Sequence, residues 1–263
     1  MARLFIFGLG YTAGRFAQEM RGRGWQVDAT GSAGNIDWMD AVSVVEHLER
    51  ATHVLSSVPP DRDDGVDPVL DFYDDIFDGQ WLGYLSSTGV YGDADGAWVD
   101  ESSPTDGGRR SARAECDACW LEAGARVFRL PGIYGPSRSA FERVESGKAH
   151  RIDLPGQVFS RVHVDDIVAG VVAAIESGAP QGAYNLADDL PTSQNAVIEE
   201  ACRLMGVSPP PLQTIEEADL SPMARGFYAE NRRVANGKAK RVLDWEPRYP
   251  TYREGLAAIR APA

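Results

Sequence analysis

The chain has 263 residues, 43% of them hydrophobic, and a formal net charge of −13 at pH 7. That length suits one large domain or a domain with a smaller lobe, and the negative charge argues against nucleic acid or an anionic membrane surface as a partner. No apolar stretch approaches the roughly 20 residues of a membrane helix, and the three cysteines form no disulfide framework, so we expect a soluble, cytoplasmic protein.

The chain begins with an apolar strand, a glycine-rich loop and an amphipathic helix. The run RLFIFG, residues 3–8, is typical of a parallel strand buried on both faces, and residues 12–23 place apolar side chains at helical spacing. Gly8 permits a tight turn between them, and Gly10 lets the backbone approach a pyrophosphate at the helix N-terminus. The loop therefore predicts a dinucleotide site. Its predicted contacts are Gly8, Gly10, Tyr11 and Thr12.

The end of the second predicted strand, residues 25–31, bears on the choice between NAD and NADP. NAD sites usually place a carboxylate there, where it binds the ribose 2′-hydroxyl. This chain instead has Asp28 inside the strand and Gly31 and Ser32 at its end. This strand end has no carboxylate that would repel a 2′-phosphate, and Ser32 could donate a hydrogen bond to such a phosphate. We therefore predict a preference for NADP, with NAD as the alternative.

Three further runs of strand length follow, separated by helical segments. They are residues 51–60, 81–88 and 125–132. Before the last run, small and apolar side chains mark one predicted helix face: Ala112, Cys116, Cys119, Trp120 and Ala123. Strands that alternate with helices imply a parallel, doubly wound sheet. We therefore predict an α/β fold of the Rossmann type, with residues 1–135 as the dinucleotide-binding domain.

The alternation of strands and helices becomes less regular from Pro136 onward, so we predict that residues 136–263 form a smaller C-terminal substrate lobe. Within this part, residues 159–175 and 182–188 could return to the main sheet. The segment 225–254 carries eight basic and four acidic residues, which suits an anionic ligand or, equally, a solvated helix face. The candidate substrate-binding residues in this segment are Tyr228, Asn231, Arg232 and Arg233.

Four short motifs together resemble the extended and atypical branch of the short-chain dehydrogenase/reductase superfamily, the NAD-dependent epimerase/dehydratase family. The motifs are GLGYTAG, SSTGVYG, RLPGIYGP and HVDDIV, which begin at residues 8, 86, 129 and 163. The resemblance implies a nicotinamide between the strand that ends at Ser86 and Ser87 and the turn at Pro131. It also implies that three residues after the fourth strand flank the cofactor: Val58, Pro59 and Pro60.

The resemblance assigns a role to Ser87, the family's active-site hydroxyl, which would hydrogen-bond a substrate oxygen. Its neighbour Ser86 would contact the cofactor. The alternative for Ser87 is a strand-end serine that satisfies its own backbone. Tyr91 and Tyr134 lie in the two YG turns of these motifs, and either could supply a catalytic phenol or pack structurally.

The chain departs from the family where its acid/base pair would lie. The usual tyrosine, with a lysine four residues on, falls on Gly107 and Ser111 here. The acid pair of the family's sugar-nucleotide dehydratases falls on Thr88 and Gly89, which argues against dehydratase chemistry.

Two other motifs are interpreted as structural. The resemblance implies that His163 is structural and that Asp165 and Asp166 anchor the helix that follows it. Cys116 and Cys119 form a C-x-x-C with no second cysteine pair and no histidine cluster, so core packing is favoured over redox chemistry and we predict no metal site.

Two hypotheses of function remain. The first is an NAD(P)-dependent oxidoreductase or epimerase with a nonstandard acid/base, acting on a small molecule as a monomer or homodimer; the substrate could be anionic or resemble a nucleotide sugar. The second is a catalytically inactive sensor or scaffold that still binds the cofactor. The glycine loop supports both, the missing tyrosine–lysine pair favours the second, and the intact SSTGVYG turn favours the first.

Overall fold

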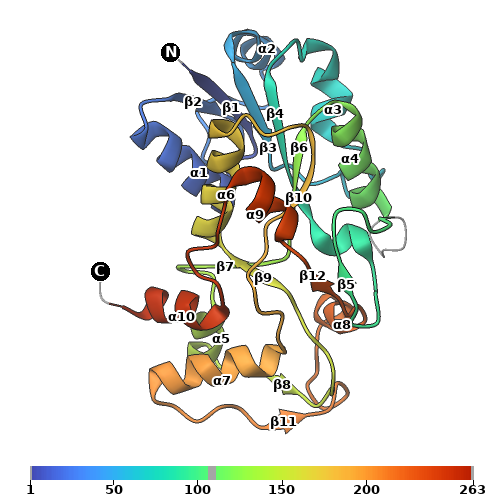
Figure 1. The fold of residues 1–263 in the computed structure, drawn as a ribbon, viewed down its shortest axis with the longest axis vertical. Coiled ribbons are helices and arrows are strands. Elements are labelled where there is room, and N and C mark those ends of the chain that lie inside the picture. Colours follow the sequence, from blue (N-terminus) through green and yellow to red (C-terminus); the bar gives the residue numbers. More distant parts are fainter. Residues whose placement is uncertain (1, 106–110, 262–263) are drawn as a thin grey trace.

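A six-stranded parallel sheet forms the centre of the protein (Figure 1). The computed structural model describes residues 2–105 and 111–261. The strands follow the spatial order β10-β6-β4-β3-β1-β2. Their bounds are β1 Arg3–Phe7, β2 Gln26–Ala29, β3 His53–Ser56, β4 Trp81–Ser87, β6 Arg126–Leu130 and β10 Gly182–Asn185. All five neighbouring pairs are parallel, as a doubly wound α/β sheet requires.

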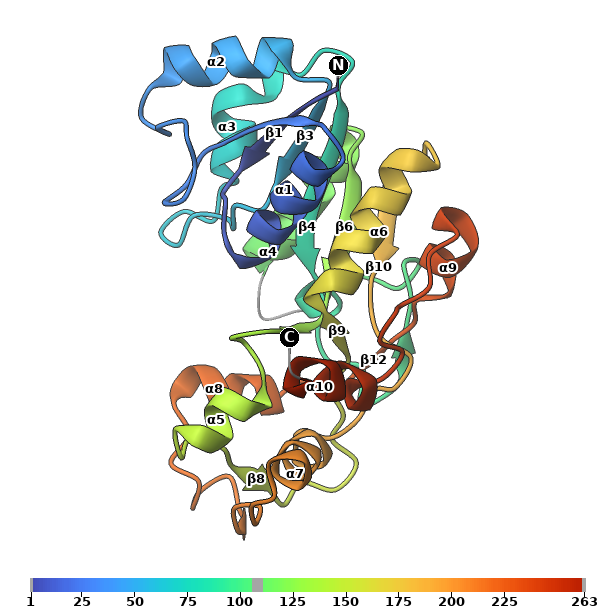
Figure 2. The ribbon, with the colours of Figure 1, turned by 90° about the vertical axis from the view of Figure 1, so that its left-hand side faces the viewer.

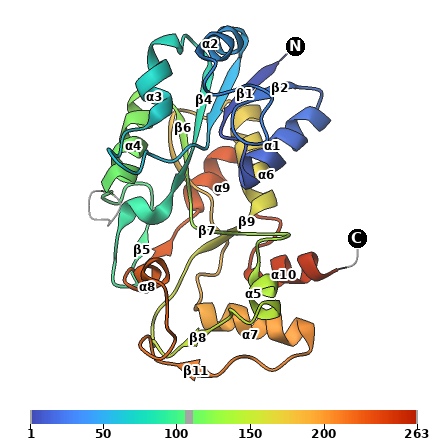
Figure 3. The ribbon, with the colours of Figure 1, turned by 180° about the vertical axis from the view of Figure 1, so that it is seen from behind.

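Helices cover both faces of this sheet because alternate strand residues point to opposite sides. In β1, Leu4 and Ile6 pack with one group of helices, whereas Phe5 and Phe7 pack with the other. The first group is α1 Tyr11–Gly22, α6 Val164–Glu176 and α9 Gly237–Leu243, and the second is α2 Ala41–Arg50, α3 Pro68–Tyr73 and α4 Ser111–Glu122. Figures 2 and 3 show the two layers from the side and from behind. The predicted Rossmann-type fold is confirmed.

The strand order changes direction between β1 and β3, since β2 lies on one side of β1 and β3 on the other. In open α/β sheets such a switch point, at the carboxyl ends of the strands, is where ligands bind. Val58, Pro59 and Pro60 follow β3, the third strand along the chain and not the fourth. The reason is that α2 alone connects β2 to β3.

A smaller lobe lies below the carboxyl ends of the strands in Figure 1. Its helices are α5 Ala140–Glu145, α7 Gln194–Met205, α8 Pro222–Tyr228 and α10 Tyr252–Arg260, and a short parallel pair joins β8 Arg151–Ile152 to β11 Leu212–Gln213. Side chains of α5, α7 and α10 form a separate apolar core around Phe141, Ile198 and Leu256. The chain returns from the lobe to the main body twice. The first return forms α6, which packs on α1, and β10, which becomes an edge strand; the second forms α9, which packs on α6.

Two further short parallel pairs lie between the body and the lobe. They are β5 Trp98–Val99 with β12 Arg233–Val234, and β7 Gly132–Tyr134 with β9 Arg161–His163. The 3-10 helices are η1 Asp74–Ile76 and η2 Thr88–Tyr91. Both pairs join segments that are far apart in the sequence, so they connect the lobe to the strand ends. Within residues 2–105 and 111–261, no helix is both long and apolar enough to cross a membrane.

The buried face of α4 differs from the predicted one. Cys116 and Trp120 are buried as expected, but Cys119 is exposed and Asp117 lies in the core in its place. The physical reason is a partner for the carboxylate: Arg129 of β6 forms a buried ion pair with Asp117 at 2.6 Å. No group of acids, histidines and cysteines in the described residues is placed to hold a metal ion.

Candidate active site

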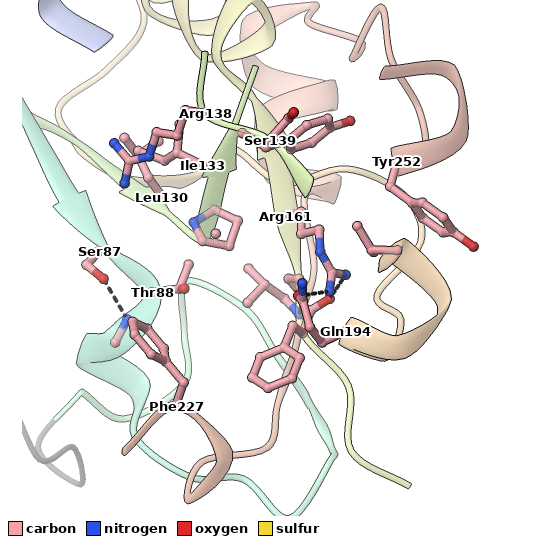
Figure 4. A pocket seen from close by; sticks show the side chains of 18 of the residues that line it. Ser87, Thr88, Leu130, Ile133, Arg138, Ser139, Arg161, Gln194, Phe227 and Tyr252 are labelled. Carbon is pink, nitrogen blue, oxygen red and sulfur yellow. Dashed lines mark hydrogen bonds between the residues drawn. The ribbon is translucent and has the colours of Figure 1, made fainter. Parts of the chain in front are cut away.

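A cavity of about 990 Å³ opens between the strand ends and the lobe. The glycine loop, the end of β4, the turn after β6 and the helices of the lobe all contribute to its lining. Figure 4 shows Ser87 and Thr88 on one side of it and Arg161 and Gln194 on the other. Of the predicted cofactor residues, those that line it are Gly10, Tyr11, Thr12, Ser86 and Pro131.

The other predicted cofactor residues lie in the loops after β1, β2 and β3 but outside the lining. They are Gly8, Ser32, Val58, Pro59 and Pro60. Gly8 has a φ of +82°, which only glycine adopts easily, and its carbonyl accepts a hydrogen bond of 2.5 Å from the Ser57 hydroxyl, which itself lines the cavity. Gly8 thus forms the turn that leads from β1 to Gly10.

Gly10 caps the N-terminus of α1 and faces open space. No atom lies within 4 Å of the position that a Cβ on Gly10 would occupy. No side chain caps this helix, and its first turn holds no acidic residue, so its free backbone N–H groups can bind an anion. This is the geometry that the pyrophosphate of a dinucleotide needs.

No carboxylate occupies the end of β2. Asp28 lies inside the strand, where its carboxylate accepts a hydrogen bond of 2.9 Å from the Asn35 amide. Gly31 has a φ of +104°, and a Cβ there would lie 2.8 Å from the backbone nitrogen of Leu9, so the two loops approach closely. Ser32 is exposed. The end of the strand therefore offers a hydroxyl and no negative charge.

Ser87 stands at the last position of β4 and caps η2. Its oxygen accepts a hydrogen bond of 3.1 Å from the backbone N–H of Gly89, which leaves its own proton available for donation into the cavity (Figure 4). Ser86, in contrast, donates to Asp117 at 2.6 Å. Of the two serines, Ser87 is therefore the one whose hydroxyl can donate into the cavity.

The structure does not bring Tyr91 to the cavity. The residue is 5% exposed and lies outside the lining. Its phenol donates to Asn185 at 2.7 Å and accepts from Arg129 at 3.0 Å. Burial raises its pKa, which the nearby Arg129 offsets only in part. This environment favours a structural role for Tyr91.

Tyr134 does line the cavity, but its hydroxyl points toward the lobe. The oxygen lies 3.5 Å from the carbonyl oxygen of Thr251, and a Cβ on Gly255 of α10 would collide with it. Burial raises the phenol's pKa far above its ordinary value. Among the described residues, therefore, neither predicted phenol is presented as a ready acid or base. Of the predicted acid/base positions, Gly107 lies outside the described residues and Ser111 begins α4.

The four predicted substrate residues divide into two groups. Tyr228 and Arg232 line the cavity, whereas Asn231 and Arg233 do not. The Arg232 guanidinium donates to the Gly92 carbonyl at 2.5 Å and pairs with a carboxylate two residues before it. Asn231 connects loops by accepting from the N–H of residue 158, and Arg233 donates to the carbonyl of residue 96.

Sequence reasoning missed the residues on the lobe side of the cavity. Arg161 is 6% exposed and lines the cavity together with Gln194. His150 also lines it, and its Nε2 lies 3.2 Å from the Tyr228 hydroxyl. An arginine among the apolar residues of FSRVHV was the available signal for Arg161, since a charged residue in a buried strand needs a reason.

The lining of the cavity is basic although the protein is acidic. It contains five arginines: Arg113, Arg138, Arg143, Arg161 and Arg232. Its acidic residues are Glu142 and Glu230, and Glu142 is held by Ser139 in the capping box of α5. Charges of one sign at the wall of a cleft attract ligands of the other sign. The cavity therefore suits an anionic molecule.

The sequence matches no family model. It is 33% identical over 141 residues to a 3-diazoavenalumate denitrifying reductase from Streptomyces sp; the match covers 49% of this chain and 45% of that protein, so the chain spans about half the length of this relative. A conserved protein of unknown function from Silicibacter pomeroyi is 39% identical, with 99% and 98% of the two chains covered and a TM-score of 0.87.

More distant structures share the fold. The dTDP-glucose 4,6-dehydratase of Bacillus anthracis, solved in complex with NAD, is 16% identical, with 99% of this chain and 96% of that chain covered and a TM-score of 0.75. At this level of identity the likeness concerns the arrangement of the chain.

Proposed function

Because this chain belongs to the same family as the Silicibacter pomeroyi protein and has the fold of the NAD-dependent epimerases and dehydratases, we propose that it is a nicotinamide-dinucleotide-dependent oxidoreductase or epimerase acting on a small anionic molecule. The family resemblance of the four sequence motifs is confirmed at the level of the fold. The observation that carries the proposal is the open space over Gly10, at the uncapped end of α1 and facing the cavity.

The described residues fit such a cofactor. The backbone N–H groups at the start of α1 would hold the pyrophosphate, and Ser86, Ser87 and Pro131 would flank the nicotinamide, which when bound supplies or accepts hydride. The absence of a carboxylate at the end of β2 supports a preference for NADP.

Ser87 would hydrogen-bond the substrate atom on which negative charge develops. No phenol–lysine pair is available among the described residues to move a proton in the same step, so a hydride transfer that needs no concurrent proton donor suits this site better than interconversion of an alcohol and a ketone. The Streptomyces relative is named as a reductase, which agrees with that choice.

The test uses the protein loaded with NADPH and a panel of aromatic acids with reducible substituents, together with nucleotide sugars. Reduction is followed as loss of NADPH absorbance. Epimerisation consumes no cofactor, so it is followed by chromatography of the nucleotide sugars after incubation with the NADP⁺-loaded protein. Replacing Ser87 by alanine should lower turnover by ~10²-fold, the usual loss for one preorganised donor, and should affect NADPH binding far less, because the pyrophosphate is held at the start of α1. Ser146→Ala, at an exposed serine outside the cavity, is the matched control.

Full turnover by Ser87→Ala would remove Ser87 from the mechanism.

A second candidate function, a cofactor-binding sensor without turnover, is favoured by the hydrogen bonds of both phenols to structural partners. Tight NADPH binding with no turnover across the whole panel would support the sensor.

A further inference from the structure

The lobe side of the cavity carries a buried positive charge. The guanidinium of Arg161 donates hydrogen bonds to the carbonyl oxygens of Phe159 at 2.9 Å, Thr192 at 3.0 Å and Ser193 at 3.4 Å, and to the side-chain oxygen of Gln194 at 3.1 Å. All of these acceptors are uncharged. In the described part of the chain, no carboxylate forms an ion pair with this guanidinium.

An arginine buried without a counter-ion is unfavourable, because neutral dipoles replace its hydration only in part. Asp188 is the carboxyl whose charge acts most on Arg161. Burial raises the pKa of Asp188 to about 7, so this carboxyl is only partly ionised at neutral pH. The guanidinium therefore lacks a full counter-charge in the free protein, and a ligand in the cavity can supply one.

Aromatic side chains surround this charge. The Cζ atom of Arg161 lies 6.0 Å from the centre of the Phe159 ring, and the Tyr228 ring packs edge-on against Phe159 at 5.5 Å. Val197 and Leu256 add aliphatic surface to the same lining. A ligand whose anionic group met the guanidinium would place its next atoms against aromatic and aliphatic carbon.

We propose that Arg161 binds the carboxylate of a small aromatic acid, which takes the place at the guanidinium that the side-chain oxygen of Gln194 fills in the free protein. The planar fork of arginine matches a carboxylate, and the carboxylate would add the missing charge. This inference rests on the proposed function, since it names the substrate class of the same cavity. A nucleotide sugar would instead bring a diphosphate to the guanidinium.

The test is calorimetric titration of the NADPH-saturated protein with cinnamate and with its uncharged amide, cinnamamide. Cinnamate should bind at least ~10-fold more tightly, as expected for a charge-assisted hydrogen bond. Arg161→Met should abolish this difference. Since that variant could fail to fold, Gln194→Glu is the second: it keeps Arg161 and puts a carboxylate beside it, at the first turn of α7 where an acid is favourable, and it should exclude cinnamate.

Gln213→Glu is the matched control, because it makes the same change in the same lobe outside the cavity, and it should bind cinnamate as wild type does. Equal binding of cinnamate and cinnamamide, or unchanged cinnamate binding in Gln194→Glu, would overturn the proposal. So would Arg161-dependent binding of UDP-glucose in place of cinnamate. Separate NADPH and cinnamate titrations keep the two claims apart: lost NADPH binding would contradict the proposed function, whereas lost cinnamate binding concerns Arg161.

Discussion

A chain of buried polar contacts joins the end of β4 to the C-terminal part of the protein. Asp117 accepts from Ser86 and pairs with Arg129, which in turn donates to Tyr91, and Tyr91 donates to Asn185. Every one of these groups is at most 5% exposed. Because each buried polar group meets a partner, the network holds the hydroxyl strand at a defined position beside the cavity. Tyr91 serves this network, which explains why its phenol is not presented to a substrate.

Asp188 is a second buried acid, and burial disfavours its ionised form. It is 2% exposed, and its Oδ2 atom has no hydrogen-bond partner in the described structure. Burial raises its pKa from 3.8 to about 7, so the folded protein favours the protonated form. The stability that this acid contributes is fully present below its unfolded pKa and is lost as the pH rises through about 7.

Asp188→Asn, which stays uncharged at every pH, should therefore gain stability relative to wild type as the pH rises. From pH 5 to pH 8 the gain in the free energy of unfolding should be about 2–3 kcal/mol when measured by urea denaturation, because a tenfold difference in proton affinity between the folded and unfolded states corresponds to about 1.4 kcal/mol. Asp153→Asn, at an exposed aspartate, should track wild type at both pH values. A difference between Asp188→Asn and wild type that is the same at pH 5 and pH 8 would contradict this role of Asp188.

The sequence predicts a residue's surroundings well only when the residues that determine them lie close to it along the chain. The positions of Gly10 and Ser87 at the cavity could be predicted, because each follows from a strand end and the residues beside it. The role of Tyr91 could not, since its partners Arg129 and Asn185 lie 38 and 94 positions away along the chain. The exposure of Cys119 likewise depends on a distant contact, because Arg129 of β6 pairs with Asp117 on the other side of α4. Long-range pairing, which spacing does not encode, accounts for these differences.

At the scale of elements, the loops after β1 and β2 act as one unit. The backbone N–H of Leu9 donates to the Thr30 carbonyl at 2.8 Å, and the hydroxyl of Thr30 accepts from the N–H of Gly8 at 3.2 Å. Gly31 completes the close approach. The end of β2 therefore lies beside the glycine loop, as the sequence predicts for a dinucleotide site, where a residue would meet the ribose of a dinucleotide bound as proposed.

Ser32→Asp should reverse the predicted preference for NADP. A carboxylate at this position would bind the 2′-hydroxyl of NAD and repel the 2′-phosphate of NADP. The ratio of the two dissociation constants should change by at least ~10-fold, measured by titration with NADPH and with NADH. Ser146→Asp, which adds the same charge at a distant exposed serine, should leave the ratio unaltered. A wild type that binds NADH more tightly would refute the preference itself.

The last residue of β9 caps the helix that follows it, α6. His163 caps α6 by accepting a hydrogen bond of 3.2 Å from the N–H of Asp165. Asp166 accepts from the backbone N–H groups of Arg248 and Tyr249 at 2.7 Å and 3.2 Å, which attaches the segment before α10 to the main body. The sequence predicts anchoring by these residues, but not that Asp166 binds a segment 82 positions away.

At the scale of the whole molecule, an acidic protein carries a basic cavity between two unequal parts. The net charge is −13, yet five arginines line the cavity. Contacts such as the hydrogen bond from the Tyr11 hydroxyl to the Pro136 carbonyl, at 2.9 Å, join the glycine loop directly to the start of the lobe. The sequence predicts both parts, because strand–helix alternation is a local pattern, but the cavity depends on how the parts meet.

The central claim is that the loop at Gly10 binds a nicotinamide dinucleotide, and titration of wild type and Gly10→Val with NADPH tests it most directly. The variant should fold, since no atom lies within 4 Å of the added Cβ, but its side chain would fill the space of the pyrophosphate. Gly14→Val is the matched control, one turn along α1, with equally free space and outside the cavity. We expect binding by wild type and Gly14→Val and none by Gly10→Val. Equally tight binding by Gly10→Val would contradict the claim.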